Sequence, residues 1–327
     1  MARPPTRLRV LSATDIDRAI DMPASIDVMS AAFTQLAAGR ANVPPRLGLT
    51  TDDGLVLAMP GSLPDERALA IKIVTVFPGN ARSGLPSIYG LVLVLDASTG
   101  APVALMEGSH LTALRTGATS GLATKFMARG DAHVVAMFGA GVQARSQLAG
   151  VRAVRGIREV RIVSRRAERA EQFARELAGL DVRVLRDAST ALRGADIIIT
   201  ATTSSTPLFD GQDLDPGAHI NAIGAYTAQM REVDSVAVRR ARVVVDTRQG
   251  ALIEAGDLLI PMREGTIDAE HIVAELGELV NGSIPGRTRA DEITLFKSVG
   301  HAAEDVALAH RVLETATVQN IGTMVSL

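Results

Sequence analysis

Hydrophobic positions follow two patterns in the first third of the chain. Apolar residues recur at helical spacing over residues 14–20 and 25–38, which predicts two helices, the second with Ser25 as its N-cap. Short apolar runs separated by turn residues follow, and they predict strands at 55–59, 69–76, 88–95 and 103–106. Consecutive short strands joined by turns favour an antiparallel meander.

Strand and helix patterns alternate from about residue 116 to residue 299. Apolar runs predict strands at 133–138, 159–163, 182–185, 196–201, 219–223 and 242–246, and the clearest helices span 142–154 and 167–178. This alternation predicts a parallel sheet with right-handed crossovers. A final helix, at about 301–316, is not needed by such a sheet and is free to pack on the first part of the chain.

A glycine-rich turn follows the first strand of the alternating region. The apolar run ends at Gly139, and the pattern G-x-G-x-x-A continues to Ala144, where a helix begins. Glycines at this turn allow a tight bend and let the backbone approach a pyrophosphate, while the helix N-terminus attracts the phosphates. We therefore expect a bound nicotinamide dinucleotide beside Gly139, Ala140, Gly141, Val142 and Gln143, although Gln143 is equally an ordinary helix-start residue.

The end of the second strand indicates which nicotinamide cofactor is bound. NAD enzymes usually carry an acidic residue there, which accepts hydrogen bonds from the adenosine ribose. Here the strand ends in Ser164, Arg165 and Arg166, and a hydroxyl followed by guanidinium groups suits a 2′-phosphate. The sequence predicts NADP(H) in preference to NAD(H). The alternative is that both arginines are solvated residues at a helix start.

Composition excludes several other classes of protein. The net charge of −2 and the 3% aromatic content give no support to nucleic-acid binding. The chain has no cysteine, which excludes disulfides and thiolate catalysis and fits a reducing compartment. The six histidines show no H-x-x-x-H pair, so no metal site is expected. The basic start lacks the apolar region of a secretory signal, and no apolar stretch is long enough for a bilayer. We expect a cytoplasmic protein that does not bind membranes.

Several segments together resemble the ornithine cyclodeaminase/mu-crystallin family. They occur in family order, cover most of the chain, and are far more specific than the glycine motif alone. The segments are Pro44-Pro45-Arg46, Ala70-Ile71-Lys72-Ile73-Val74, Leu111-Thr112-Ala113-Leu114-Arg115-Thr116-Gly117-Ala118, Gly139-Ala140-Gly141-Val142-Gln143-Ala144, His219-Ile220-Asn221-Ala222-Ile223-Gly224, Arg231-Glu232-Val233-Asp234 and Phe296-Lys297-Ser298-Val299-Gly300.

The resemblance implies an α/β fold with two domains. A Rossmann domain with a doubly wound parallel sheet would span residues 116–300. A second α+β domain with an antiparallel sheet, for substrate binding and dimerisation, would combine residues 1–115 with 301–327. It also implies a homodimer joined through the N-terminal strands. Family members pass hydride between a nicotinamide and an α-carbon that bears a nitrogen and a carboxylate.

The resemblance also assigns roles to individual residues. Arg46, Lys72 and Arg115 match the positions that hold the substrate carboxylate, and a carboxylate removed from water needs such charged donors. The alternative for Lys72 is an outward-facing position on an alternating strand. Thr116 and, again, Arg115 match positions at the cofactor, and Ser298 and Val299 match positions beside nicotinamide and substrate. Thr202, Thr203 and Ser204 follow the fourth strand and should line the nicotinamide ribose, and we expect Gly224 near the cofactor.

One departure from the family pattern separates the possible activities. Cyclodeaminases carry Gly-Gly-Asp after the fifth strand, and that aspartate is a catalytic acid/base. This chain carries Gly224, Ala225 and Tyr226 instead. A phenol is a poor base at neutral pH because it holds its proton well above neutrality. It can still donate a proton to an imine nitrogen, although water, Lys72 or an imine already protonated in solution could serve equally.

The sequence therefore favours an NADPH-dependent reductase of cyclic imino acids, such as Δ1-pyrroline-2-carboxylate or Δ1-piperideine-2-carboxylate. Lys72 and Tyr226 are its candidate catalytic residues. The alternatives within the family are an L-amino-acid dehydrogenase of the alanine type, reductive amination of a 2-oxo acid, and an ornithine cyclodeaminase. A non-catalytic binding protein of the mu-crystallin type is the alternative from a different class.

Overall fold

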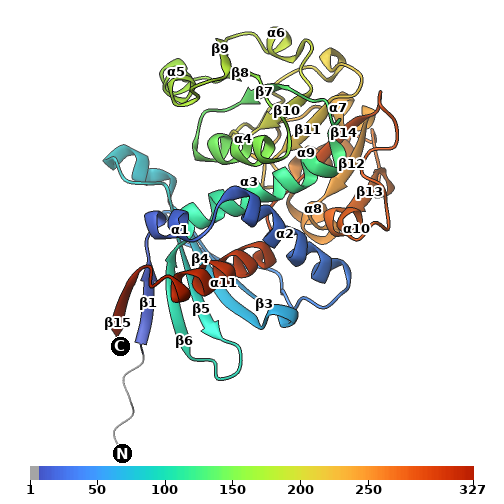
Figure 1. Cartoon of the computed structure of the whole chain (residues 1–327). Coiled ribbons are helices and arrows are strands. Elements are labelled where there is room, and N and C mark those ends of the chain that lie inside the picture. The colour runs from blue at the N-terminus through green and yellow to red at the C-terminus, as the bar shows by residue number, and fades with distance from the viewer. Residues whose placement is uncertain (1–6) are drawn as a thin grey trace, which may run out of the picture. The chain divides into compact units, whose positions relative to one another are not determined.

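The computed structural model describes residues 7–327, so Met1 to Thr6 of the basic start lie outside the described residues. The chain forms two compact units (Figure 1). Unit 1 combines Met1–Arg115 with Ala302–Leu327, and unit 2 is Thr116–His301. The boundary falls inside one continuous helix, α3 (Gly108–Met127).

Unit 1 consists of one sheet and the helices that pack on it. Its helices are α1 (Ala13–Ala19), α2 (Met22–Ala37), the first part of α3, and α11 (Ala302–Val318), with short 3-10 helices at Pro64–Glu66 and Pro78–Ser83. Its strands are β1 (Arg7–Leu11), β2 (Leu47–Thr50), β3 (Leu55–Leu63), β4 (Ala68–Val76), β5 (Ile88–Asp96), β6 (Pro102–Glu107) and β15 (Thr323–Ser326).

The sheet of unit 1 has the strand order β15-β1-β6-β5-β4-β3-β2. The predicted meander is confirmed, because β3, β4, β5 and β6 pair antiparallel in sequence. The sheet is mixed rather than purely antiparallel, since β1 pairs parallel with β6. The sequence reading missed β1, β2 and β15, which are short strands near the edges.

The helices cover one face of this sheet. Helix α11 lies on β3, β4 and β5 and also packs on α2 (Figure 1). Most of its buried residues are apolar, among them Val306, Leu308, Ala309 and Val312. Helix α11, which was predicted at about 301–316, therefore completes the core of unit 1.

Both N-terminal helices begin earlier than the apolar pattern indicated. Ser12 caps α1 and Asp21 caps α2, each by accepting a backbone N–H of the first turn. The prediction of Ser25 as an N-cap is wrong. Ser25 is buried inside α2, where its hydroxyl donates to the Asp21 carbonyl. Pro23 in the first turn of α2 tolerates this earlier start, because a proline there costs no helical hydrogen bond.

Unit 2 is built on a parallel sheet with helices on both faces. Its strands are β7 (Val134–Phe138), β8 (Glu159–Val163), β9 (Asp181–Leu185), β10 (Ile197–Thr200), β11 (His219–Ala222), β12 (Ala241–Val245), β13 (Ile272–Glu275) and β14 (Ile293–Lys297). Its helices are the rest of α3, α4 (Val142–Val154), α5 (Ala167–Glu176), α6 (Ala188–Leu192), α7 (Ser235–Arg240), α8 (Arg248–Glu254), α9 (Gly256–Arg263) and α10 (Leu276–Val280), with 3-10 helices at Gly211–Asp213 and Ala269–His271.

The strand order of this sheet is β13-β12-β14-β11-β10-β7-β8-β9, with all pairs parallel. The run β9-β8-β7-β10-β11-β14 is the doubly wound order 3-2-1-4-5-6. All six predicted strands exist, but the sixth predicted strand, β12, is not the neighbour of β11. Strand β14, which the sequence reading missed, lies between them.

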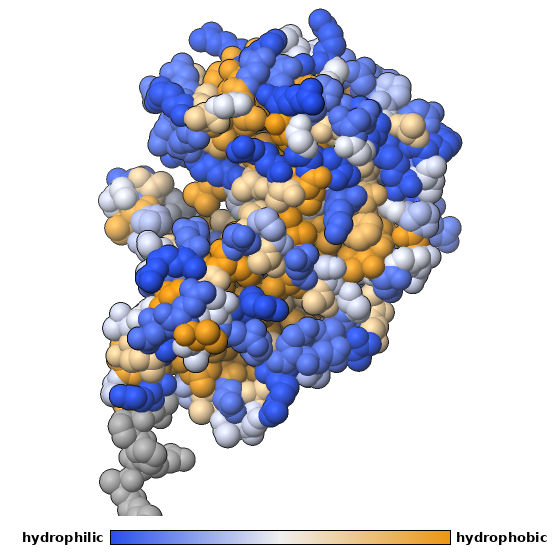
Figure 2. Space-filling view, in the orientation of Figure 1, coloured by the Kyte–Doolittle hydropathy of each residue, from blue (hydrophilic) through white to orange (hydrophobic). Residues whose placement is uncertain are grey.

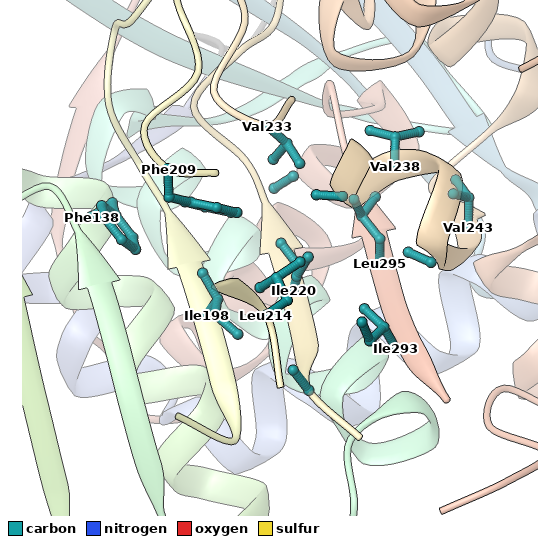
Figure 3. Close-up of a cluster of buried hydrophobic side chains, with 14 of the residues drawn as sticks. Phe138, Ile198, Phe209, Leu214, Ile220, Val233, Val238, Val243, Ile293 and Leu295 are labelled. Atoms are coloured by element: carbon teal, nitrogen blue, oxygen red, sulfur yellow. The ribbon is translucent and has the colours of Figure 1, made fainter. Parts of the chain in front are cut away.

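Buried aliphatic and aromatic side chains hold the parallel sheet between its helices. On one face, neighbouring strands contribute Phe138, Ile198, Ile220, Leu295 and Val243 (Figure 3). Helices α4 and α5 pack on the other face through a second apolar cluster. Each such aliphatic side chain contributes about 1.5–3 kcal/mol when fully buried. Continuous apolar strands are typical of a parallel sheet covered on both sides.

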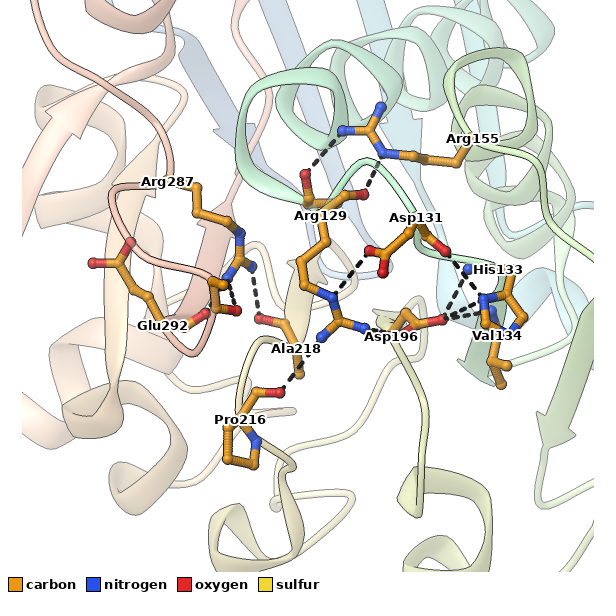
Figure 4. Close-up of polar contacts among 12 residues, drawn as sticks. Arg129, Asp131, His133, Val134, Arg155, Asp196, Pro216, Ala218, Arg287 and Glu292 are labelled. Atoms are coloured by element: carbon orange, nitrogen blue, oxygen red, sulfur yellow. Dashed lines mark hydrogen bonds and ion pairs between the residues drawn. The ribbon is translucent and has the colours of Figure 1, made fainter.

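Arginines fix the amino ends of the strands in unit 2 (Figure 4). Asp196, just before β10, accepts the backbone N–H groups of His133 and Val134 and pairs with Arg129. Arg155 donates to carbonyl oxygens at the C-terminus of α3, including that of Ala128 at 2.9 Å. This polar cluster secures the end of the sheet opposite to the glycine turn.

Within residues 7–327, no helix combines the length and the apolar character that crossing a membrane requires. The same residues contain no group of three or more His, Cys, Asp or Glu side chains arranged to hold a metal ion.

Candidate active site

Two buried cations lie side by side in unit 1. Lys72 is in the middle of β4, and its side chain is 3% exposed. Its Nζ lies 3.0 Å from Oδ1 of Asp305, and the same oxygen accepts from Nε of Arg115 at 3.2 Å. Glu304 pairs with the other side of the guanidinium, at 3.2 Å from Nη1. The outward-facing alternative for Lys72 is therefore wrong.

Burial and the neighbouring opposite charges shift the pKa values of these groups in opposite directions. Burial lowers the pKa of Lys72 to about 8, although Asp305 partly offsets the effect. Burial also opposes the charge of Asp305, but Arg115 and Lys72 outweigh it and hold the pKa of this carboxyl below its ordinary value. Arg115 behaves likewise: burial opposes its charge, and Asp305 and Glu304 raise its pKa. The four groups form a charge-balanced cluster of two cations and two anions.

The sheet register places Arg46 level with Lys72. Leu47, the next residue, is the first paired residue of β2 and lies opposite Ala58. Met59, the next residue of β3, pairs with Lys72 of β4. Arg46 is half-buried at the start of this edge strand. The three residues predicted to hold a carboxylate are thus all on unit 1, and contacts join Lys72 with Arg115 through Asp305.

The glycine turn of unit 2 has the form that the fingerprint predicts. Gly139 has a φ of +116°, and a Cβ there would lie 2.5 Å from the carbonyl oxygen of Ala201. Ala144 is fully buried against the strand. Gly141 differs, because a Cβ added to it would meet no protein atom within 4 Å. The protein itself therefore requires glycine at position 139, whereas the space beside position 141 is open to a ligand.

Helix α4 starts at this turn without a side-chain cap. Its N-cap is Gly141, and within the described part of the chain no side-chain hydrogen bond caps the helix. Val142 follows with its side chain 67% exposed, and Oε1 of Gln143 is buried with no hydrogen-bond partner among the described residues. An uncapped helix N-terminus beside open space suits a phosphate group. These residues fit a dinucleotide.

The residues after β8 are accessible. Ser164 is half-buried, and its hydroxyl accepts the backbone N–H of Arg166 at 3.3 Å. Arg165 and Arg166 are exposed, and Arg166 is the N-cap residue of α5. The surface over α5 is largely hydrophilic in Figure 2. Both guanidinium groups are thus available to an anionic ligand, and equally to solvent.

A buried glutamate organises the carboxyl ends of β10 and β11. Glu232 accepts from the backbone N–H groups of Thr202 and Gly224, at 2.6 and 2.7 Å, and from that of Ala225 at 3.1 Å. The hydroxyls of Thr200 and Thr202 also donate to it. These loops hold the predicted nicotinamide-ribose residues, of which Thr203 is exposed and Ser204 is half-buried.

A second charged pair lies behind this edge. Lys297, at the end of β14, is fully buried and pairs with Asp257 at 2.9 Å. Its Nζ also donates to the carbonyl of Ala222 at 3.0 Å. Asp257 in turn accepts the backbone N–H groups of Glu232 and Val233. The pair links β11 and β14 to the segment that carries Glu232.

Asp246 positions the residues that follow β14. Its Oδ2 accepts from the hydroxyl of Ser298 and from the backbone N–H groups of Val299 and Gly300, each at 2.8 Å. Ser298 and Val299 are therefore fixed at the carboxyl end of the sheet, where ligands of doubly wound folds bind. Tyr226 belongs to the same edge, in the loop after β11, and is 38% exposed. Thr116 is buried in α3, where its carbonyl accepts from Gln147.

Sequence reasoning assigned no role to the buried acids Glu232, Asp246, Asp257, Glu304 and Asp305. Glu232 stood in one of the motifs, but three of its five donor groups belong to Thr200 and Thr202, about 30 residues away in sequence. Glu304 and Asp305 form the dipeptide Glu-Asp within the apolar, buried first half of α11. Acidic residues at apolar helix positions were the one signal that could have indicated a buried ionic cluster.

The fold and this edge define the class of protein first: a Rossmann-type α/β protein with a glycine fingerprint at the end of its first strand. The family follows from comparison. The model of the ornithine cyclodeaminase/mu-crystallin family matches residues 7–320, and the chain belongs to this family.

Individual relatives are similar over nearly the whole chain. The Δ1-pyrroline-2-carboxylate reductase of Bacillus cereus is 39% identical over 322 residues, covering 97% of this chain and 99% of the relative. The structure of Thermococcus litoralis Δ1-pyrroline-2-carboxylate reductase with NADH and L-proline is 43% identical, covers 96% and 99% of the two chains, and has a TM-score of 0.93. An archaeal alanine dehydrogenase dimer with bound NAD is 34% identical, covers 98% and 99%, and has a TM-score of 0.92.

Proposed function

We propose that this protein is a cytoplasmic, NADPH-dependent reductase of cyclic imino acids that forms proline or pipecolate. The proposal rests on the 39% identity over 97% of the chain to a Δ1-pyrroline-2-carboxylate reductase. Lys72 and Arg115 support it, because two charged donors at low exposure suit a carboxylate removed from water. Unit 2 would bind the cofactor and unit 1 the substrate carboxylate.

The side chains can assist the reaction in three ways. Arg46, Lys72 and Arg115 would bind the carboxylate and fix the orientation of the substrate ring. Glu232 and Asp246 hold the loops that would line the nicotinamide, so these loops need not reorganise during the reaction. The cofactor, when bound, supplies the hydride. Tyr226 is the proposed proton donor to the imine nitrogen.

The reaction is tested by following the loss of reduced cofactor at 340 nm. We expect rapid turnover of Δ1-pyrroline-2-carboxylate or Δ1-piperideine-2-carboxylate. The same assay with pyruvate and ammonia examines the second candidate, an alanine-type dehydrogenase, which the 34% identical archaeal enzyme favours. A higher kcat/KM with pyruvate and ammonia would replace the first proposal by the second. The cyclodeaminase is less favoured, because Tyr226 occupies the position of its catalytic aspartate.

Removal of Arg165 tests the cofactor preference. We expect a higher kcat/KM with NADPH than with NADH, and we expect Arg165→Ala to lower kcat/KM for NADPH about tenfold, since a hydrogen bond between charged groups contributes about 1.5–3 kcal/mol. The value for NADH should change little. Arg169→Ala, another exposed arginine on α5, is the matched control. Equal values for the two cofactors in the wild type would overturn the preference, and the NADH bound in the Thermococcus litoralis structure makes this comparison essential.

The role of Tyr226 is tested by removing one oxygen atom. Tyr226→Phe keeps the ring, which is 38% exposed, and removes the hydroxyl. If the hydroxyl protonates the imine, kcat should fall at least tenfold, because general acid catalysis typically contributes 10²–10⁴-fold. The KM of the cofactor should stay the same. An unchanged kcat/KM would assign proton donation to another group.

The homodimer is also proposed for this chain. The face of the unit 1 sheet opposite to α11 exposes large apolar side chains. Leu47, Ile73 and Leu91 align across β2, β4 and β5, and they are 70%, 42% and 47% exposed in the single chain. Leu49 and Tyr89 extend the same face. A contiguous apolar sheet face suits a partner subunit.

A further inference from the structure

The two acids on α11 have no role in the function proposed above. Asp305 and Glu304 are 1% and 0% exposed, and they adjoin the two cations that would bind the substrate carboxylate. Placing anions beside a site for an anion is counterproductive unless they serve the cations. The contacts of Asp305 show how it does so.

Among residues 7–327, the side-chain hydrogen bonds and ion pairs of Asp305 are all with cations. Its Oδ1 accepts from Nζ of Lys72 at 3.0 Å and from Nε of Arg115 at 3.2 Å, while Oδ2 has no hydrogen-bond partner among residues 7–327. Glu232 and Asp246 differ, because both accept mainly backbone N–H groups and so tie loops together. The side chain of Asp305 thus joins one strand and one helix only through their charged groups.

The surroundings of Lys72 leave this carboxylate as its main support. The directly opposed residues on the neighbouring strands are Met59 of β3 and Val92 of β5, which are both buried and apolar. Helix α11 contributes Asp305 and, with less effect, Glu304, whereas Arg115 of α3 repels the ammonium group. An apolar strand position next to a second cation would otherwise favour the neutral amine.

Lysine is rare in this chain, and two of its lysines are buried. The sequence has only three lysines, Lys72, Lys125 and Lys297, among 34 lysines and arginines. Lys125 is exposed, while the other two are buried in ion pairs with aspartates. Lysine differs from arginine in that burial readily changes its protonation. A buried lysine that must stay charged needs a fixed anion.

We propose that Asp305 is a positioning residue: its Oδ1 fixes the ammonium group of Lys72 and the guanidinium group of Arg115 side by side as charged donors for the substrate carboxylate. The inference deepens the proposed function and rests on it for the identity of the ligand. The effect of Asp305 on the protonation of Lys72 can be measured without turnover.

The proposal has a pH consequence with a definite sign. With a pKa of about 8, Lys72 is charged below that pH, so carboxylate binding is lost as the pH rises through this value. Asp305 raises the pKa of Lys72, so its replacement by a neutral residue moves this loss to lower pH. A neighbouring opposite charge typically shifts a pKa by about 1–3 units. In Asp305→Asn, Lys72 should therefore be largely neutral at pH 7.5.

The test combines NMR titration with kinetics on the full-length protein. Lysine labelled with ¹³C at Cε gives three signals, and the Lys72→Met variant identifies that of Lys72. In Asp305→Asn the titration midpoint of Lys72 should fall by about 1–3 pH units, and the signal of Lys125 should be unaffected. The alkaline limb of kcat/KM should move by the same amount. Glu304→Gln is the matched change on the adjacent residue. It should shift the Lys72 midpoint less, because Glu304 pairs with Arg115 instead.

The outcomes separate the two proposals. An unchanged Lys72 midpoint in folded Asp305→Asn overturns the inference, even if activity falls. Absence of imino-acid turnover in the wild type overturns the proposed function, while the NMR midpoint still decides the role of Asp305. If Asp305→Asn does not fold, Asp305→Glu retains the charge and displaces the oxygen by one methylene. It should keep the Lys72 midpoint and raise the substrate KM at least tenfold, and an unchanged KM would contradict positioning.

Discussion

Replacing Lys72 by methionine is expected to lower kcat/KM for the imino acid about 100-fold. Methionine keeps the apolar stem of the side chain on β4 and removes the ammonium group. A hydrogen bond between charged groups contributes about 1.5–3 kcal/mol, and the loss is larger where water cannot replace the donor. The effect should lie mainly in the substrate KM, with the affinity for the cofactor unchanged. Steady-state kinetics and cofactor titration measure the two quantities.

The protein should remain folded in this variant. Asp305 keeps its second ion pair, with Arg115, so no buried anion is left without a partner. Lys125→Met, at an exposed position of α3, is the matched control and should behave as the wild type. Wild-type kinetics in Lys72→Met would show that the substrate carboxylate binds elsewhere.

Replacing Gly141 by alanine should reduce cofactor affinity by about 10- to 100-fold, the equivalent of losing one hydrogen bond to a charged group. The expected cause is steric. The space beside Gly141 is free of protein atoms within 4 Å of an added Cβ, so the methyl group would meet the pyrophosphate and not the protein. Calorimetric titration with NADPH and NADH measures the loss.

Thermal unfolding without cofactor distinguishes binding from folding in this experiment. Gly141 has a φ of −91°, which alanine adopts easily, so the variant should be at least as stable as the wild type. Gly156→Ala is the control, since that glycine is exposed and also has free space around it. Gly139→Ala should lower Tm instead, because of its positive φ and the nearby Ala201 carbonyl. Unchanged cofactor affinity in Gly141→Ala would contradict the proposed phosphate site.

Local patterns predicted most of the secondary structure. The strand β7, the turn at Gly139 and helix α4 follow from neighbouring residues, because apolar periodicity and glycine geometry are local properties. The meander β3 to β6 follows from the same kind of pattern. The short strands β1, β2 and β15 could not be found in this way, since four or five residues contain too little of a pattern.

Pairing between distant segments was the less predictable part. Strand β14 lies between β11 and β12, although it comes last of the three in sequence. A strand at 293–297 that contains Lys297 does not look like the centre of a sheet. Its ammonium group is accommodated because Asp257 and two backbone carbonyls surround it. Only the folded chain shows these partners.

In the candidate site too, some residues could be indicated from the sequence and others could not. Residue types and family resemblance indicated the cations Arg46, Lys72 and Arg115, because a carboxylate needs basic partners. The acids that pair with Lys72 and Arg115 could not be indicated, since Asp305 is 190 residues from Arg115 in sequence. Positions that bind a ligand reflect the chemistry of the ligand, whereas positions that support them depend on the fold.

Transfer of deuterium from the cofactor to the substrate tests whether this protein reduces cyclic imino acids. The enzyme would be supplied with NADPH deuterated at the transferred C4 position and with Δ1-pyrroline-2-carboxylate, and the product would be analysed by mass spectrometry and NMR. We expect proline with one deuterium at C2 for each cofactor oxidised. Unlabelled proline would contradict direct hydride transfer. No conversion of Δ1-pyrroline-2-carboxylate or Δ1-piperideine-2-carboxylate, by a protein that binds the cofactor, would contradict the proposed reductase activity.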